Sequence, residues 1–241
     1  MEFKFPTTPQ EAGKGKLITY LPVRPGAGAT TLACMSAYMI SQSALIDFTP
    51  ESKVRSYLGY QGDISATSIL NINSVETYDG IFAASEEHHK GIKVFPGIPV
   101  AKILDGDLID TLLVLKAITS LKNASPATIA VSEPLFRTGW LTAMLSDVVC
   151  LVVKPDRVSM DAFHPTMDLL NRLGCSERVK IILNQNKYPG CITPDDSIKF
   201  YSPDIIIDYN PKIATGANKR EVYLDTKIKK ALSLIIKGEQ D

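Results

Sequence analysis

The chain has 241 residues, 45% of them hydrophobic, which is enough to bury a substantial core as one domain over residues 1–241. Its 26 basic and 26 acidic residues cancel, so it has no bulk electrostatic attraction to nucleic acid or to an anionic membrane. No apolar run reaches the roughly 18 residues of a membrane span. The polar stretch 1–15 lacks the apolar core of a secretion signal, and we expect it to lead into the first strand.

Apolar runs typical of strands alternate with helix-like segments along the chain. Several runs are continuously apolar, as expected for strands buried on both faces of a parallel sheet. The expected strands are Leu17–Tyr20, Ala44–Phe48, Ile92–Phe95, Thr128–Val131, Val148–Val153, Lys180–Leu183 and Ile205–Tyr209. The expected helices are Thr31–Ser41, Leu108–Lys122, Leu141–Ser146, Ser159–Leu173 and Leu224–Ile236. This alternation predicts a doubly wound α/β fold, with a mostly parallel sheet and helices on both faces.

The segment that joins the first strand to the first helix is the most informative of the chain. It is a glycine-rich turn, R-P-G-A-G-A-T-T, over residues 24–31. Gly26 and Gly28 would let backbone N–H groups converge on an anion at a helix N-terminus. Thr30 and Thr31 stand where a hydroxyl holds Mg²⁺ and a phosphate oxygen. The layout is that of a phosphate-binding loop.

This turn departs from the pattern G-x-x-x-x-G-K-[ST] at two positions. Val23 occupies the first glycine position, and Ala29 occupies the lysine position. Two interpretations therefore stay open. The turn either packs closely without binding anything, or it binds phosphate with a charge supplied from elsewhere, for which Arg24 is the candidate.

Four cysteines are scattered along the chain without C-x-x-C spacing: Cys34, Cys150, Cys175 and Cys191. We expect buried free thiols in a reducing cytosol, and therefore a cytoplasmic protein. His88 and His89 follow two glutamates. Consecutive residues of a polar loop rarely converge on one ion, so we expect a solvated charged run there rather than a metal site.

Together these segments resemble the MinD/ParA-type deviant Walker A ATPases, and most closely their CpaE/TadZ pilus-assembly branch. The loop of that family reads approximately K/R-G-G-V-G-K-T-T. It is matched without a gap by Arg24, Pro25, Gly26, Ala27, Gly28, Ala29, Thr30 and Thr31. The later segments that match the family in order are Ala44–Gly59, Asp147–Pro155, Ile181–Asn184 and Ile207–Leu224. Trp140 falls where the CpaE/TadZ branch often carries a tryptophan.

The resemblance implies a site for ATP or ADP with Mg²⁺. The phosphates would lie on residues 24–31 with Mg²⁺ at Thr30, Asp47 would keep the first position of a D-x-D motif, and Asn184 would contact adenine. It also implies a homodimer in which Arg24 reaches the nucleotide of the partner subunit, and protein partners in a pilus or secretion machine. Plainer interpretations remain for three of these residues: a surface arginine at 24, a cap of the next turn at 47 and a turn residue at 184.

The departures from the family pattern concern catalysis. Ala29 lacks the ammonium group that contacts the β- and γ-phosphates, although the CpaE/TadZ branch tolerates alanine or serine there. Thr49 stands where a second aspartate would orient the attacking water, and Ser132 where the Walker B aspartate would hold the Mg²⁺ shell. Glu133 could supply the missing acid, but adjacent strand residues point to opposite sides, so we expect it to face away.

We therefore expect a hydrolysis-deficient localisation or assembly factor that binds nucleotide weakly. One alternative is an active ATPase of the partition or division-site type, and another is a structural pseudo-ATPase that binds no nucleotide.

The basic and apolar segment Lys227–Lys237 also has two interpretations. MinD proteins end in an amphipathic helix that binds membrane. The spacing of Ile228, Leu232, Ile235 and Ile236 equally describes a helix docked on the sheet. Because the family resemblance places the final core helix here, we expect core packing and no membrane association without a partner.

Overall fold

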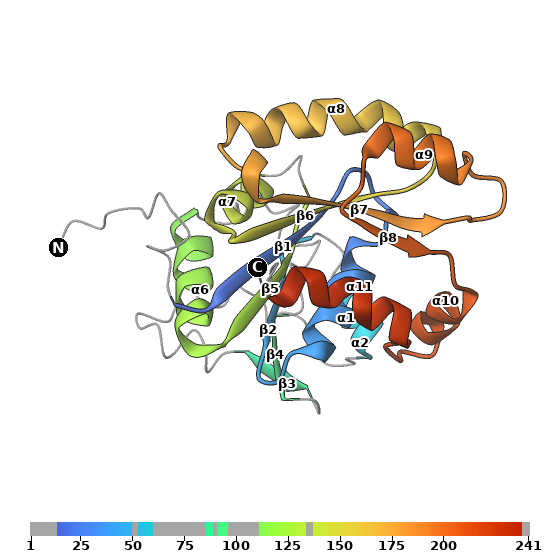
Figure 1. Ribbon diagram of the computed structural model, residues 1–241. Helices are drawn as coiled ribbons and strands as arrows, with labels where there is room; N and C mark the ends of the chain where they lie inside the picture. Colours follow the sequence, from blue (N-terminus) through green and yellow to red (C-terminus); the bar gives the residue numbers. More distant parts are fainter. Residues whose placement is uncertain are drawn as a thin grey trace, which may run out of the picture.

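The computed structural model of the protein describes residues 14–49, 53–59, 85–88, 91–95, 111–133 and 137–237. Within these ranges the strands form one sheet in the order β3-β4-β2-β5-β1-β6-β7-β8 (Figure 1). They are β1 (Lys16–Pro22), β2 (Ala44–Asp47), β3 (Glu86–His88), β4 (Ile92–Phe95), β5 (Ala127–Val131), β6 (Val148–Val153), β7 (Val179–Asn186) and β8 (Ile205–Asp208). Neighbouring strands are parallel except β3 and β4. The predicted mostly parallel sheet is confirmed.

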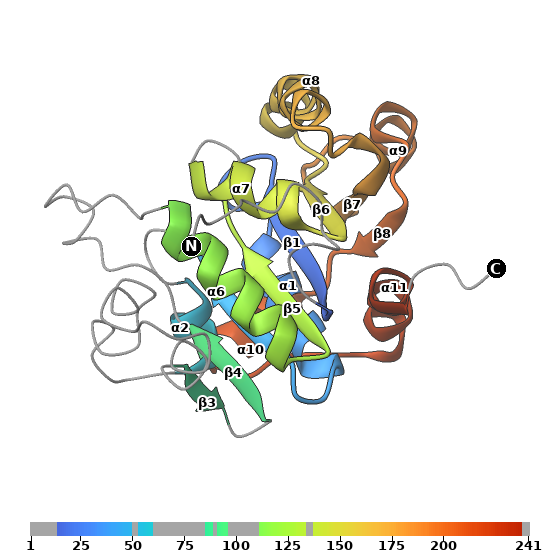
Figure 2. The same ribbon diagram turned by 90° about the vertical axis from the view of Figure 1, so that its left-hand side faces the viewer.

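Helices cover both faces of this sheet. They are α1 (Ala29–Met39), α2 (Lys53–Leu58), α6 (Thr111–Ala124), α7 (Arg137–Leu145), α8 (Arg157–Arg172), α9 (Pro194–Tyr201), α10 (Pro211–Asn218) and α11 (Thr226–Lys237). One face packs against α1, α2, α10 and α11. The other packs against α6, α7, α8 and α9 (Figures 1 and 2). The fold is therefore doubly wound, as the alternation of elements predicted.

The central strand β1 shows why its sequence is almost continuously apolar. Ile18 and Tyr20 point into the core beneath α1, while Leu17 and Leu21 point into the core of the opposite face. The strand lies between β5 and β6, where the order of connections along the sheet reverses. In open α/β sheets, ligands bind beyond the carboxyl ends of the strands at such a switch point. The loop that follows β1 lies at this place.

A partly buried ion pair fixes the opposite end of β1. The ammonium of Lys122 is 2.9 Å from Asp147 Oδ2, and the side chain of Lys122 is only 1% exposed. The same carboxylate oxygen accepts a hydrogen bond from Leu17 N at 2.7 Å. One carboxylate thus joins the end of α6, the start of β1 and the residue that precedes β6.

The C-terminal helix α11 is docked on the sheet. Ile228, Leu232 and Ile235 are buried in the core that includes α1. Lys16 Nζ donates hydrogen bonds to the carbonyl oxygens of Ile235 and Ile236, both at 3.1 Å, and so satisfies the last turn of α11. The expected core packing is confirmed. Across the described ranges, no helix is long and apolar enough to cross a membrane.

Within the described ranges, five short elements were not predicted from the sequence: α2, β3, the 3-10 helix η3 (Ser176–Arg178), α9 and α10. Thr193 caps α9 by accepting a hydrogen bond from Asp196 N, and Asn210 caps α10 in the same way from Lys212 N. Each cap is followed directly by a proline in the first turn. A capping residue followed by proline is a sequence signal for the start of a helix, so both helices could have been predicted from it.

Some expectations fall on parts of the chain outside the described residues. These are the lead-in up to residue 13, residues 50–52 of the second matched segment, residues 108–110 and His89. Cys34, Cys150 and Cys175 are buried free thiols as expected, whereas Cys191 is free but only partly buried.

Candidate functional site

The loop between β1 and α1 has the backbone that anion binding requires. Gly26 and Gly28 have φ angles of +84° and +98°, in the left-handed region that favours glycine. Gly28 is the N-cap of α1 and offers no side-chain cap, while its carbonyl accepts from Leu32 N at 3.1 Å. The first N–H groups of a helix have no intrahelical partner. Those of α1 are therefore available to an anion.

A cavity of about 320 Å³ opens beside this loop, and we call it the loop cavity. Residues at or just beyond the carboxyl ends of β1, β2, β5 and β7 contribute to it. Its lining residues are Pro22, Pro25, Gly26, Gly28, Ala29, Thr30, Thr31, Thr49, Lys53, Tyr57, Val131, Glu133 and Gln185. The carboxyl ends of parallel strands meet at this edge, which explains why residues so distant in sequence converge here.

A second cavity of about 320 Å³, the Asn184 cavity, adjoins the loop cavity and shares Gly28, Thr31 and Gln185 with it. Its other lining residues are Leu32, Asn184, Tyr188, Asp208, Tyr209, Asn210, Ile213, Ala214 and Ala217. The rings of Tyr188 and Tyr209 meet edge to face, with centroids 4.8 Å apart. This cavity thus brings aromatic rings and side-chain amides next to the loop cavity.

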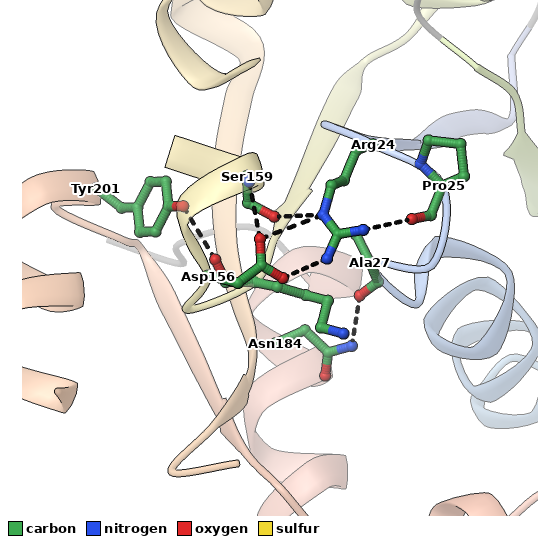
Figure 3. Close-up of polar contacts among 8 residues, drawn as sticks. Arg24, Pro25, Ala27, Asp156, Ser159, Asn184 and Tyr201 are labelled. Carbon is green, nitrogen blue, oxygen red and sulfur yellow. Dashed lines mark hydrogen bonds and ion pairs between the residues drawn. The ribbon is translucent and has the colours of Figure 1, made fainter. Parts of the chain in front are cut away.

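Asn184 also holds the loop itself. Its side-chain amide is buried and donates a hydrogen bond to the carbonyl oxygen of Ala27 at 2.8 Å (Figure 3). A Cβ atom on Gly28 would lie only 2.3 Å from the same amide nitrogen. The absence of a side chain at position 28 therefore serves the packing of Asn184 as well as the backbone conformation.

Arg24 does not line either cavity, because its guanidinium lies on the start of α8 (Figure 3). It forms an ion pair with Asp156 and donates a further hydrogen bond from Nε to Ser159 Oγ at 3.2 Å. Asp156 is the N-cap of α8 and accepts from Ser159 N at 2.8 Å. Although partial burial opposes it, these hydrogen bonds from Arg24 and Ser159 lower the pKa of Asp156. Arg24 is thus engaged within its own chain.

Asp47 is buried and acts as a structural cap. Its carboxylate accepts hydrogen bonds from Thr49 N at 2.8 Å, from Thr49 Oγ1 at 2.6 Å and from Val54 N at 3.0 Å. Burial raises its pKa to about 6, and the hydrogen bonds oppose that rise. The carboxylate therefore holds the start of α2. The hydroxyl of Thr49 donates its hydrogen bond to this carboxylate. The plainer interpretation of Asp47, a cap of the next turn, describes what it does here.

The expectation that Glu133 faces away from the site is wrong. Val131 and Glu133 both line the loop cavity, whereas Ser132 between them is fully buried. The hydroxyl of Ser132 lies on the α7 side, 3.3 Å from the position of a Cβ on Gly139, and has no hydrogen-bond partner among the described residues. Adjacent residues do point to opposite sides, but Glu133 is the one on the cavity side.

Lys53 is a site residue that the sequence analysis missed. It lies in the first turn of α2, lines the loop cavity and has its ammonium 3.6 Å from the carboxylate of Glu133. Gln185 and Tyr188, which line the cavities, were missed as well. A basic residue six positions after Asp47 was the available signal for Lys53.

Most of the predicted site residues are brought together. Those in the loop cavity are Pro25, Gly26, Gly28, Ala29, Thr30 and Thr31, and Asn184 lines the adjoining cavity. Arg24, Ala27 and Asp47 lie behind these cavities and hold the loop, α2 and α8 in place.

The donor atoms fit Mg²⁺ as a companion of bound phosphate. Thr30, Thr31 and Glu133 supply hydroxyl and carboxylate oxygens to the loop cavity, and Mg²⁺ prefers oxygen ligands. Across the described residues, no group of three or more histidine, cysteine or acidic side chains is placed to hold a metal by itself. This set suits an ion that keeps water molecules and shares substrate phosphates.

Comparison with known proteins shows which solved structures share this fold. No family model matches the chain, and no curated protein does. Among solved structures, the MinD cell division protein of Aquifex aeolicus has a TM-score of 0.73 and 19% identity, over 94% of this chain and 98% of that chain. A plasmid partition protein of Borrelia burgdorferi bound to AMPPNP has a TM-score of 0.74 and 13% identity, over 93% and 98%.

A ParA family ATPase of Chlorobium tepidum has a TM-score of 0.71 and 17% identity, over 90% of this chain and 96% of that chain. At these identities the likeness concerns the fold. The chain therefore has the fold of the MinD and ParA P-loop ATPases.

Proposed function

We propose that this protein binds ATP or ADP with Mg²⁺ at residues 24–31, hydrolyses it poorly or not at all, and acts as a localisation or assembly factor. The observation that carries the proposal is the N-terminus of α1, which has no side-chain cap and lines the loop cavity. It follows a turn in which Gly26 and Gly28 have left-handed backbone conformations. Backbone N–H groups of this kind bind phosphate without any side chain. The Borrelia burgdorferi neighbour is bound to AMPPNP, which supports a nucleotide as the ligand.

The weak hydrolysis rests on the chemistry near the loop. Phosphoryl transfer depends on positioning and on charge stabilisation, and the loss of one such donor costs about 10²–10³-fold in rate. Ala29 carries no charge, and the hydroxyl of Thr49 is committed to Asp47. Ser132 is buried on the other side of the sheet. None of these three positions therefore offers a carboxylate or a cation to orient or activate water.

The first expected result is that purified protein with Mg²⁺ and ATP releases phosphate no faster than a buffer control. Calorimetric titration of the same sample should show that ATP binds. Ala29→Lys alone should not restore turnover, because the two carboxylates would still be missing. Dose-dependent phosphate release that disappears in Gly28→Val would overturn the hydrolysis-deficient assignment.

One observation favours the alternative of a working partition-type or division-site-type ATPase. Glu133 places a carboxylate in the loop cavity, where it could serve the Mg²⁺ shell in place of Ser132. Turnover that is lost in Glu133→Gln would establish this alternative. If titration with ATP releases or absorbs no heat, the result would instead favour the structural pseudo-ATPase that binds no nucleotide.

We further infer a homodimer that serves a pilus or secretion machine, from the resemblance to the CpaE/TadZ branch and from the face that carries the loop. Trp140 on α7 and Val158 on α8 are 41% and 61% exposed, and both helices begin at the same edge of the sheet as the loop. Because Arg24 is paired with Asp156, it does not reach toward the nucleotide of a partner subunit. Nucleotide therefore contributes little to the stability of such a dimer. Protein contacts would supply most of its stability.

Self-association should therefore depend little on ATP. In analytical ultracentrifugation, wild-type protein is expected to sediment as a dimer both with and without ATP, and Arg24→Ala should shift it only slightly. Arg172→Ala is the matched control, since it removes an exposed arginine at the far end of α8, away from the edge of the sheet that carries the loop. A monomer in every condition would refute the dimer, and a dimer formed only with ATP would show that nucleotide controls assembly.

A further inference from the structure

The loop cavity contains a charged pair that the family pattern does not predict. Of the residues that line it, all within the described ranges, Lys53 is the cation and Glu133 is the carboxylate. Their charged atoms are 3.6 Å apart, and their side chains are 38% and 16% exposed. The pair is therefore reachable from the cavity rather than sealed inside the core.

The fold holds Lys53 toward the loop. Asp47 accepts a hydrogen bond from Val54 N and so fixes the first turn of α2 against the end of β2. Tyr57, four residues after Lys53, lines the same cavity. Residues four apart lie on one face of a helix, so α2 presents this face to the loop.

The loop itself lacks a side-chain cation. Ala29 stands at the lysine position of the P-loop pattern, and the guanidinium of Arg24 lies on Asp156. Backbone N–H groups bind phosphate oxygens but bring no net charge to balance a polyphosphate. The ammonium of Lys53, which lines the same cavity, supplies such a charge, since lysine binds phosphate as a point charge.

We propose that Lys53 is the phosphate-binding cation of this site, in place of the lysine absent at position 29, and that Glu133 is its counter-ion when no nucleotide is bound. This inference rests on the proposed nucleotide binding. Phosphate competes with Glu133 for the same ammonium, so the carboxylate weakens binding of metal-free nucleotide while it keeps the lysine directed at the cavity.

The test is calorimetric titration of ATP into wild type and variants. Lys53→Met should weaken ATP binding by about tenfold or more, because a charge-assisted hydrogen bond is lost, while Lys53→Arg should retain most of the affinity. Lys199→Met, which removes an exposed lysine on α9, is the matched control and should bind ATP as wild type does. The unliganded variants should melt close to wild type, because a partly exposed ion pair contributes little to stability.

A second arm uses EDTA to exclude divalent metal. Under these conditions Glu133→Gln should bind ATP about threefold more tightly than wild type, since the competing carboxylate is gone. Weaker binding of Glu133→Gln in EDTA would overturn the counter-ion role.

The two proposals fail in different ways. Wild-type protein that binds no ATP would overturn nucleotide binding and the role of Lys53 together. Wild-type protein that binds ATP, with Lys53→Met equal to it, would overturn only the role of Lys53.

Discussion

Gly28→Val is expected to abolish the rise in melting temperature that ATP produces in the wild-type protein. The new Cβ would lie 2.3 Å from the side-chain nitrogen of Asn184, and φ at this position is +98°. A β-branched residue cannot adopt that conformation without strain, so the loop must move and its N–H groups no longer converge. Ligand stabilisation, which depends on binding to the native state, should then vanish in a thermal-shift titration.

The matched control is Gly174→Val, which places the same side chain at another left-handed glycine. Gly174 has a φ of +68°, and a Cβ there would meet nothing within 4 Å. This variant should lose stability from backbone strain yet keep the shift caused by ATP. An unchanged shift in Gly28→Val would move the nucleotide site away from the loop.

Asp147→Ala is expected to lower the free energy of unfolding by about 2–4 kcal/mol. It removes the counter-charge of Lys122, whose side chain is 1% exposed, and the acceptor of the Leu17 N–H group. Breaking a buried pair from one side is costly because the remaining charge stays buried. Asp147 itself is 30% exposed, which keeps the expected loss in the lower part of the usual range.

Urea denaturation of three variants tests this asymmetry. Lys122→Met should cost less than Asp147→Ala, because it removes the buried charge and leaves a carboxylate that water can reach. Asp161→Ala breaks a surface pair with Arg157, with side chains 71% and 81% exposed, and should change stability by no more than about 0.5 kcal/mol. Equal losses in all three variants would contradict a special contribution from the buried pair.

Local pattern was sufficient for the main elements of the fold. Strands β1 and β6 were predictable because strands covered on both faces need apolar residues at almost every position. The docking of α11 was predictable from the spacing of Ile228, Leu232 and Ile235, which places one stripe on the sheet. Both are local consequences of burial. The missed helices α9 and α10 are short, and their evidence lies in caps rather than in periodicity.

The partners of the site residues could not be predicted in the same way. Arg24 meets Asp156 across 132 positions of sequence, and Asn184 meets Ala27 across 157. Nothing local to Arg24 distinguishes a residue directed at a partner's phosphate from one that braces the start of α8. That choice depends on where β6 ends relative to β1, which is a property of the assembled sheet.

The sequence by itself determined the doubly wound sheet, the position of the loop and its need for two glycines, because period, burial and backbone sterics are local properties. It also indicated that Ser132 and Glu133, which directly follow β5, point to opposite sides. Only the tertiary structure decided that Glu133 faces the cavity and that Lys53 stands opposite it. Alternation along a strand fixes relative directions, whereas the side on which the site lies depends on which helices cover each face.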